Sequence, residues 1–177
     1  MSDTLMTIIA IFLAAILMFI FPLMSVAERG DDMSQLAVQT AATEFVDNAR
    51  AIGKITIEDY DKLVATINAT GNAYDVEMEV KVLDENIGKK TPWTQGTVIG
   101  ENVYYSVYTS QITDVIEDPN GAGVYAMKEG DFFSVTIKNT NKTMAQTIRS
   151  VFYSISGGNA ASIAVQHSGV VTATGSN

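Results

Sequence analysis

The stretch MSDTLMTIIAIFLAAILMFIFPLMSVAERGDD, residues 1–32, decides the architecture of this 177-residue chain. No formally charged side chain stands between Asp3 and Glu28. Residues 5–24 are apolar apart from Thr7, and Pro22 is the one irregular position. Twenty residues of helix extend about 30 Å, which is the hydrocarbon thickness of a bilayer. The stretch therefore predicts a helix that can cross a membrane.

A cleaved signal peptide is the competing interpretation of the same stretch. Pro22 would break the helix, and the small residues 25–27 (SVA) could be read by a signal peptidase, with Ala27 as the last residue removed. However, the segment before the apolar run carries Asp3 and neither lysine nor arginine, and the run is longer than a usual signal-peptide core. We expect the segment to be retained as a single-pass anchor.

The composition of the chain excludes or disfavours several kinds of binding and chemistry. Twenty acidic against eleven basic side chains give a formal net charge of −9, which disfavours binding to nucleic acid. The chain contains no cysteine, which excludes disulfides, thiolate zinc sites and a cysteine nucleophile. Beyond the apolar run, the length suffices for one modest domain. The fold must be held by packing alone.

A second helix-forming pattern follows the apolar run almost directly. In residues 32–53, DMSQLAVQTAATEFVDNARAIG, apolar residues recur at steps of four and three, and Gly53 ends the pattern. This apolar face consists of Val38, Ala42, Phe45, Ala49 and Ile52. We predict one rod of about 70 Å over residues 1–53, bent at Pro22 and Gly30, that carries a globular head of residues 54–177.

The first half of the head gives clear patterns. Thr56 is a predicted N-cap for a helix that ends before Gly71. The sequence AYDVEMEVKVLD alternates as a half-buried strand. Its inward residues are Tyr74, Val76, Met78, Val80 and Val82, and its outward residues are Asp75, Glu77, Glu79 and Lys81. Trp93, in the loop that follows, is a predicted anchor.

In the second half, VYYSVYTSQITDVIED suits a strand as well as a helix, and we favour a strand that leads into a short helix ending at Glu117. A turn in DPNGAG follows. VYAMKEGDFFSVTIKN predicts a hairpin around residues 128–130. TNKTMAQTIRSVFYSISGG predicts an amphipathic helix with Met144, Ile148, Val151, Phe152 and Ile155 buried. ASIAVQHSGVVTAT predicts a closing strand before a frayed GSN end. The fold class is therefore α+β, a long helix followed by a small head with an antiparallel sheet.

We find no constellation of residues that predicts an enzyme. Nucleophile-elbow, phosphate-loop and dinucleotide motifs are absent from the sequence. His167, the only histidine, lies in a predicted strand where a structural role is favoured. Residues 118–121 could offer oxygens to calcium, but they lack the carboxylate spacing of an EF-hand and suit a plain turn. We expect no catalytic residue, cofactor or metal site.

The chain resembles the type IV pilin superfamily in the broad sense, which includes pseudopilins and the TadE-like proteins. The resemblance rests on the uncharged helix of residues 5–24, its amphipathic continuation to Ile52, a proline at the depth of Pro22, and a small α+β head. Residues 43–72, TEFVDNARAIGKITIEDYDKLVATINATGN, are similar to short TadE-like proteins of clostridia-type bacteria. The prepilin peptidase signature is missing, and Leu5 stands where the family has an acidic residue, which leaves Asp3 as the nearby carboxylate.

The resemblance implies a structural subunit of a bacterial surface filament. Such a subunit is held in the cytoplasmic membrane with its head outside, is handled by a pilus or secretion machinery, and then forms a homopolymer through its N-terminal helix. The implied membrane and assembly residues are Asp3, Leu5, Ile9, Phe12, Ile16, Phe19, Pro22 and Val26. Two alternatives stay open, namely a single-pass accessory or minor pseudopilin of a secretion, pilus or conjugation machine, and a secreted binding domain with a cleaved signal peptide.

Overall fold

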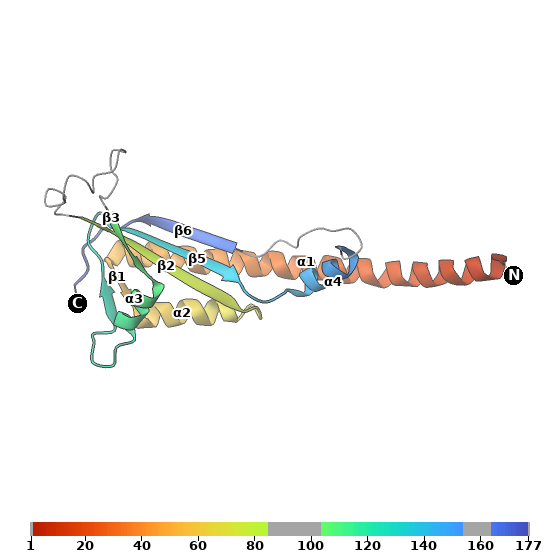
Figure 1. The fold of residues 1–177 in the computed structure, drawn as a ribbon, viewed down its shortest axis with the longest axis horizontal. Coiled ribbons are helices and arrows are strands. Elements are labelled where there is room, and N and C mark those ends of the chain that lie inside the picture. Colours follow the sequence, from red (N-terminus) through yellow and green to blue (C-terminus); the bar gives the residue numbers. More distant parts are fainter. Residues whose placement is uncertain (1, 85–103, 154–163, 177) are drawn as a thin grey trace, which may run out of the picture.

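Helix α1, Ser2–Ile52, is one uninterrupted helix of 51 residues, about 77 Å long. The computed structural model describes residues 2–84, 104–153 and 164–176, and in it α1 runs the whole length of the molecule (Figure 1). The N-terminal part of α1 projects beyond the other described elements, and the second half lies along the head. The two predicted helices are therefore a single element.

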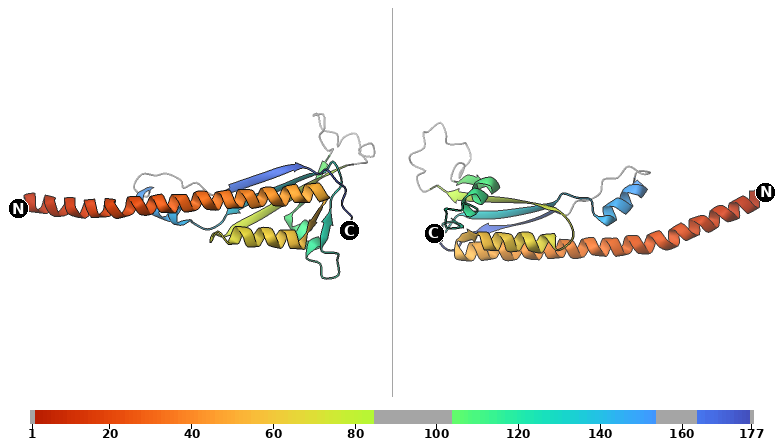
Figure 2. Two further views of the ribbon diagram at one scale, coloured as in Figure 1. Left: turned by 180° about the vertical axis from the view of Figure 1, so that it is seen from behind. Right: turned by 90° about the horizontal axis from the view of Figure 1, so that it is seen from below.

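The helix continues through both Pro22 and Gly30, the two residues at which bends are predicted. Proline lacks an N–H, so Pro22 removes one bond from the helical ladder, but the neighbouring turns keep theirs. Gly30 leaves open space around its backbone and does not interrupt the helix. Figure 2 shows a gentle curve of α1 in place of two sharp kinks.

Within the part of the chain that the structure describes, the head adds nine short elements to α1. In chain order they are β1 (Lys54–Thr56), α2 (Ile57–Asn68), β2 (Tyr74–Leu83), β3 (Tyr104–Tyr108), α3 (Thr109–Ile116), β4 (Val124–Ala126), β5 (Phe132–Asn139), α4 (Met144–Tyr153) and β6 (Ala164–Val170). Four strands form an antiparallel sheet in the order β3-β2-β5-β6, and β1 pairs with β4 in a separate two-stranded sheet. The predicted α+β class with an antiparallel sheet is confirmed.

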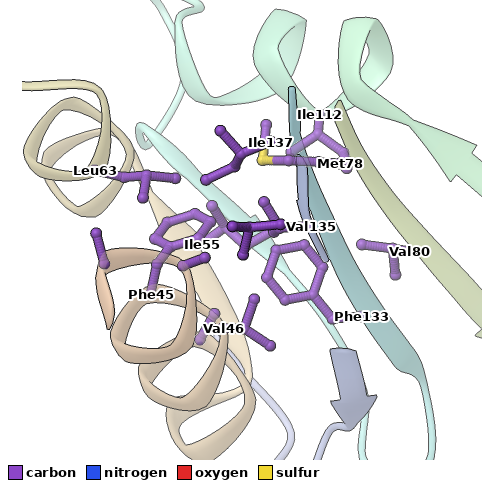
Figure 3. Close-up of a cluster of buried hydrophobic side chains, with 14 of the residues drawn as sticks. Phe45, Val46, Ile55, Leu63, Met78, Val80, Ile112, Phe133, Val135 and Ile137 are labelled. Atoms are coloured by element: carbon purple, nitrogen blue, oxygen red, sulfur yellow. The ribbon is translucent and has the colours of Figure 1, made fainter. Parts of the chain in front are cut away.

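The core lies between the sheet and the second half of α1, which has α2 beside it (Figure 3). Phe45 of α1 meets Phe133 of β5 edge to face, with ring centroids 5.9 Å apart. Such pairs add to the free energy gained by burial alone. The strand residues Met78, Val80, Phe133, Val135 and Ile137 and the helix residues Val46, Leu63 and Ile112 belong to the same cluster. The head is thus built on α1 and not merely attached to it.

Several local predictions are confirmed. The Thr56 hydroxyl accepts a hydrogen bond from the Asp59 backbone N–H and caps α2. In β2, Met78 and Val80 face the core while Asp75 and Glu77 face solvent, as their alternation requires. The strand β3 passes directly into α3, and the turn in residues 118–121 forms around Asp118.

The predicted hairpin around residues 128–130 is wrong. A turn is present there, since the Asp131 N–H donates to the Lys128 carbonyl, but β4 pairs with β1 and β5 pairs with β2 and β6. The reason lies in the end of α1, where the Gly53 carbonyl accepts from the Met127 N–H and draws the β4 segment away from β5. The inward positions predicted for β5 are nevertheless confirmed.

Three further expectations need correction. Met144 is 65% exposed, because α4 turns Ala145 and not Met144 toward α1. Ile52 is 39% exposed, because the chain turns at Gly53 just where the apolar face would have continued. The end of the chain does not fray at Gly175, whose N–H donates to the Met127 carbonyl. Trp93, Ile155 and the side chains of Val151 and Phe152 lie outside the described residues.

The buried residue Asp131 connects three segments of the chain at the end of the sheet where β2 ends and β5 begins. Asp131 is 2% exposed, and its two side-chain oxygens accept from the backbone N–H groups of Leu83, at 2.9 Å, and Lys128, at 2.8 Å. Its backbone carbonyl accepts from Val171 at 2.8 Å. One residue therefore connects the end of β2, the turn before β5 and the chain after β6.

We predict that Asp131→Asn lowers the free energy of unfolding by about 2 kcal/mol, since the amide NH₂ cannot accept from one of the two N–H groups. The measurement is chemical denaturation of the full chain in mild detergent. Asp114→Asn, the same change at an exposed site on α3, is the control and should leave the midpoint nearly unchanged. Equal midpoints for the two variants would contradict the role of Asp131.

The end of the chain crosses the end of α1 at a very close approach. Gly53 has φ +72, and a Cβ there would overlap the Ala173 carbonyl and the Gly175 N. The Thr172 N–H donates to the Arg50 carbonyl at 3.1 Å in the same contact. Residues 171–175 thus hold the C-terminal turn of α1 in place.

Gly53→Ala should cost more than about 3 kcal/mol of stability, because the left-handed backbone costs about 1 kcal/mol and the overlap displaces residues 173–175. Gly71 is a matched control, with φ +81 and open space around it, so Gly71→Ala should show only the backbone cost. Thermal denaturation of both variants separates the two contributions. Similar losses for the two would mean that the approach of the chain end is unimportant.

Candidate functional site on the exposed half of α1

The first half of α1 presents a continuous apolar surface. Its predicted assembly residues are exposed, from Ile16 at 39% to Phe19 at 75%, and the others are Leu5, Ile9, Phe12 and Val26. Pro22 and Asp3 are exposed as well. One helix near the N-terminus is therefore long and apolar enough to cross a membrane. Such a surface is costly in water and needs lipid or protein around it.

Five of the exposed residues share a regular line. Leu5, Phe12, Phe19, Val26 and Met33 follow one another at steps of seven, and each is between 62% and 75% exposed. Seven residues are nearly two helical turns, so the five side chains form one slowly winding ridge. We call these five residues the outer ridge. It continues past the charged residues 28–32 to Met33.

The polar groups of this half are satisfied within the helix. The Thr7 hydroxyl donates to the Asp3 carbonyl at 2.8 Å, so the single hydroxyl of the apolar run has its bond in any surroundings. Asp3 lies in the first turn, where a carboxylate interacts favourably with the helix dipole. The segment can therefore enter an apolar phase without leaving a side-chain donor unpaired.

The second half of α1 buries most of its predicted apolar face. Val38 and Ala42 are fully buried, and Phe45 and Ala49 are nearly so, whereas Ile52 is not. Ala41 and Val46, which are not part of the predicted apolar face, are buried too. The buried face is thus wider than the single line that the spacing predicted, because both the sheet and α2 contact this half.

The two halves meet where α4 is attached. The Thr143 hydroxyl donates to the Asp31 carboxylate at 2.7 Å and accepts from the Gln146 N–H, which caps α4. The Gln146 side chain in turn accepts from the Thr143 N–H. Sequence analysis missed this capping box, although the pattern Thr-x-x-Gln signals it. Nothing in the sequence signals the partnership with Asp31, which is 112 residues away.

A second residue group links α1 to β6 near the other end. Asp47 Oδ1 lies 2.9 Å from Arg50 Nη1 and 3.3 Å from His167 Nε2. Arg50 Nε donates to the Val170 carbonyl at 2.7 Å. The only histidine of the chain therefore sits in a packing contact between helix and strand.

The remaining polar features offer little for chemistry. Within residues 2–84, 104–153 and 164–176, no three His, Cys, Asp or Glu side chains gather in a way that could hold a metal ion. A pocket of about 240 Å³ lies between α1 and α2, bordered by the ion pair of Lys62 and Glu44 at 2.6 Å. The hydrogen bond to Glu44 raises the pKa of Lys62, which keeps the ammonium charged and unsuited to act as a base.

The outward face of β2 is also paired. Glu77 forms an ion pair with Lys138 at 2.7 Å, and Glu79 accepts from the Ser106 hydroxyl at 2.7 Å. Neither contact brings reactive groups together, so the exposed half of α1 is the candidate site. Comparison of the chain with protein-family models, with curated proteins and with solved structures finds no match in any of the three.

We predict that Thr143→Val loosens α4, because the substitution removes both the helix cap and the bond to Asp31. Amide exchange in residues 145–153 should become about tenfold faster, which corresponds to the loss of about 1.4 kcal/mol. Thr66→Val is the matched control, since the Thr66 hydroxyl bonds only to the Lys62 carbonyl one turn earlier on exposed α2. Unchanged exchange in α4 would show that the contact with Asp31 does not hold it.

Proposed function

We propose that the protein is a structural subunit of a bacterial surface filament. Residues 5–24 hold it in the cytoplasmic membrane before assembly, and the same residues pack against other copies of the chain in the filament. The acidic head faces outward in both states. Neither state requires a cofactor or nucleic acid.

The observation that carries this proposal is the continuity of α1. A simple anchor needs only an apolar span and is commonly joined to its domain by a flexible linker. Here one continuous helix passes from the exposed apolar half into the core of the head, and Pro22 removes only one bond from it. Force or displacement applied to the apolar half is therefore transmitted directly to the head, as a subunit of a stiff polymer requires.

The composition of the apolar half supports packing between copies. Ala10, Ala14 and Ala15 are exposed among large apolar residues, and small residues let helices approach closely. The chain has no cysteine, so copies cannot be joined by disulfides. Burial of the exposed half against neighbouring helices is then the available source of cohesion.

A single-pass accessory subunit is the second candidate. It is favoured by Leu5, which stands where the resemblance predicts an assembly carboxylate, and by Asp3 as the only replacement. The third possibility, a cleaved secreted domain, has less support. Ala27, the residue that would precede the cut, is 8% exposed within regular helix, and cleavage there would remove a contact with the head.

The test is the sheared surface fraction of producing cells, analysed by intact mass, N-terminal sequencing and negative-stain microscopy. We expect filaments whose subunit retains residues 5–24. The double variant Ala10→Leu/Ala14→Leu stays apolar and should still enter the membrane, but the added bulk separates packed helices, so the filament yield should fall about tenfold or more. Ala65→Leu/Ala122→Leu, at exposed positions in the head, is the matched control.

The outcomes separate the candidates. Membrane protein without filaments, even for the unmodified chain, would favour the accessory subunit. A monomer that starts at Glu28 would mean that the apolar stretch is only a targeting signal. Filaments that form equally well from the Ala10→Leu/Ala14→Leu variant would contradict polymerisation through this helix.

A further inference from the structure

Helix α4 lies at the place where the exposed half of α1 meets the head. Its N-terminus is fixed by the bond between Thr143 and Asp31, and Ala145, which is 1% exposed, packs toward α1. From there α4 runs beside α1 toward the N-terminus of the chain, away from the sheet (Figures 1 and 2). It is the part of the head that extends furthest along the apolar half among the described helices and strands.

The length of α4 sets how far it reaches. The ten residues of α4 form a helix about 15 Å long. Since α1 has the same rise per residue, α4 extends along about ten residues of α1 when the two helices lie side by side. Counted back from Asp31, the end of α4 is level with about Phe21, inside the apolar run. Burial agrees with this estimate. Ile20 and Met24 are partly shielded and Ala27 is buried, and all three lie on the same side of α1 as Asp31.

A bilayer around residues 5–24 would therefore meet α4. The hydrocarbon core is about 30 Å thick, and each headgroup layer adds about 5 to 7 Å, or roughly four residues of helix. When Met24 marks the edge of the core, the headgroup layer extends to about Glu28. The N-terminus of α4, at the level of Asp31, lies just outside this layer. Residues 146–150 fall within the layer, and the last turn of α4 reaches the edge of the hydrocarbon core.

Two hydroxyl side chains of α4 are suited to such a position. The Thr147 hydroxyl donates to the Thr143 carbonyl at 3.0 Å, and the Ser150 hydroxyl donates to the Thr147 carbonyl at 2.8 Å. A hydroxyl that bonds to its own helix loses less when water is removed. These features lower the cost of placing α4 in the interface.

We propose that α4 is a membrane-contact helix whose C-terminal half reaches through the headgroup layer of a phospholipid bilayer to the edge of the hydrocarbon core while the chain is held in the membrane. This inference rests on the proposed membrane-held state and deepens it. Contact at both α1 and α4 fixes the depth of the head and its rotation about α1, which a single spanning helix leaves free. The same face of the head would then always turn toward neighbouring copies.

The absence of cysteine allows a direct test with single labelled cysteines in the full chain. The protein is reconstituted in phosphatidylcholine vesicles that contain a lipid with a spin label just below the headgroup. Met144→Cys, Thr147→Cys and Ser150→Cys each carry an environment-sensitive fluorophore, at steps of about 4 to 5 Å along α4. Leu13→Cys, in the apolar run, and Ser110→Cys, exposed on α3, are the two references.

We expect quenching by the spin-labelled lipid to increase from position 144 to 147 to 150. At position 150 it should exceed the value at Ser110→Cys by about twofold or more, because the headgroup layer is only a few ångströms thick. If all three α4 positions match Ser110→Cys while a deeply placed spin label quenches Leu13→Cys, α4 stays clear of the bilayer and this inference is overturned. If Leu13→Cys also escapes quenching, the membrane-held state itself is wrong.

Discussion

The continuity of one α-helix from Ser2 to Ile52 is the constraint on which the rest of the structure depends. The two halves of this one helix must therefore suit different surroundings. The first half needs an apolar phase or other helices around it, and the second half packs against a sheet. Because the helix is continuous, the rotation of one half determines which residues the other half presents. The placement of Phe45 against Phe133 in the core thereby also sets the direction in which the outer ridge points.

The head fastens itself to α1 at three levels along the helix. Asp31 binds Thr143 at the base of the head, Phe45 packs into the middle of the sheet, and Arg50 and Gly53 hold β6 and the chain end at the far side. Each attachment involves residues more than eighty positions away in the chain. The three attachments together hold α1 against the sheet, so α1 cannot separate from the sheet without loss of core burial and of hydrogen bonds.

Patterns with a local cause were predictable from the sequence. The alternation in β2, the cap at Thr56 and the apolar spacing around Phe45 each depend on neighbouring residues, and each is present in the structure. The hairpin before β5 was predicted wrongly because the competing partner of β4 is β1, a strand of only three residues. The roles of Asp131 and of the Thr143 contact with Asp31 were missed for the same reason, since their partners are distant in sequence. The sequence predicts that residues 5–24 of α1 form an apolar helix. Composition alone does not indicate which side of this helix lies next to the head.

The position of α4 decides which side of the apolar half stays available. Ile20, Met24 and Ala27 lie on the side of α1 that carries Asp31, to which α4 is attached, and the outer ridge from Leu5 to Met33 lies about a third of a turn away on α1. In the filament proposed above, a second copy of the chain would therefore approach the ridge without displacing α4. Because Met33 lies beyond the charged segment 28–32, the ridge extends past the apolar run that is long enough to cross a bilayer. In the proposed membrane-held state, a neighbouring helix would make its first apolar contact at Met33, and this contact would precede the larger burial of the apolar halves in the filament.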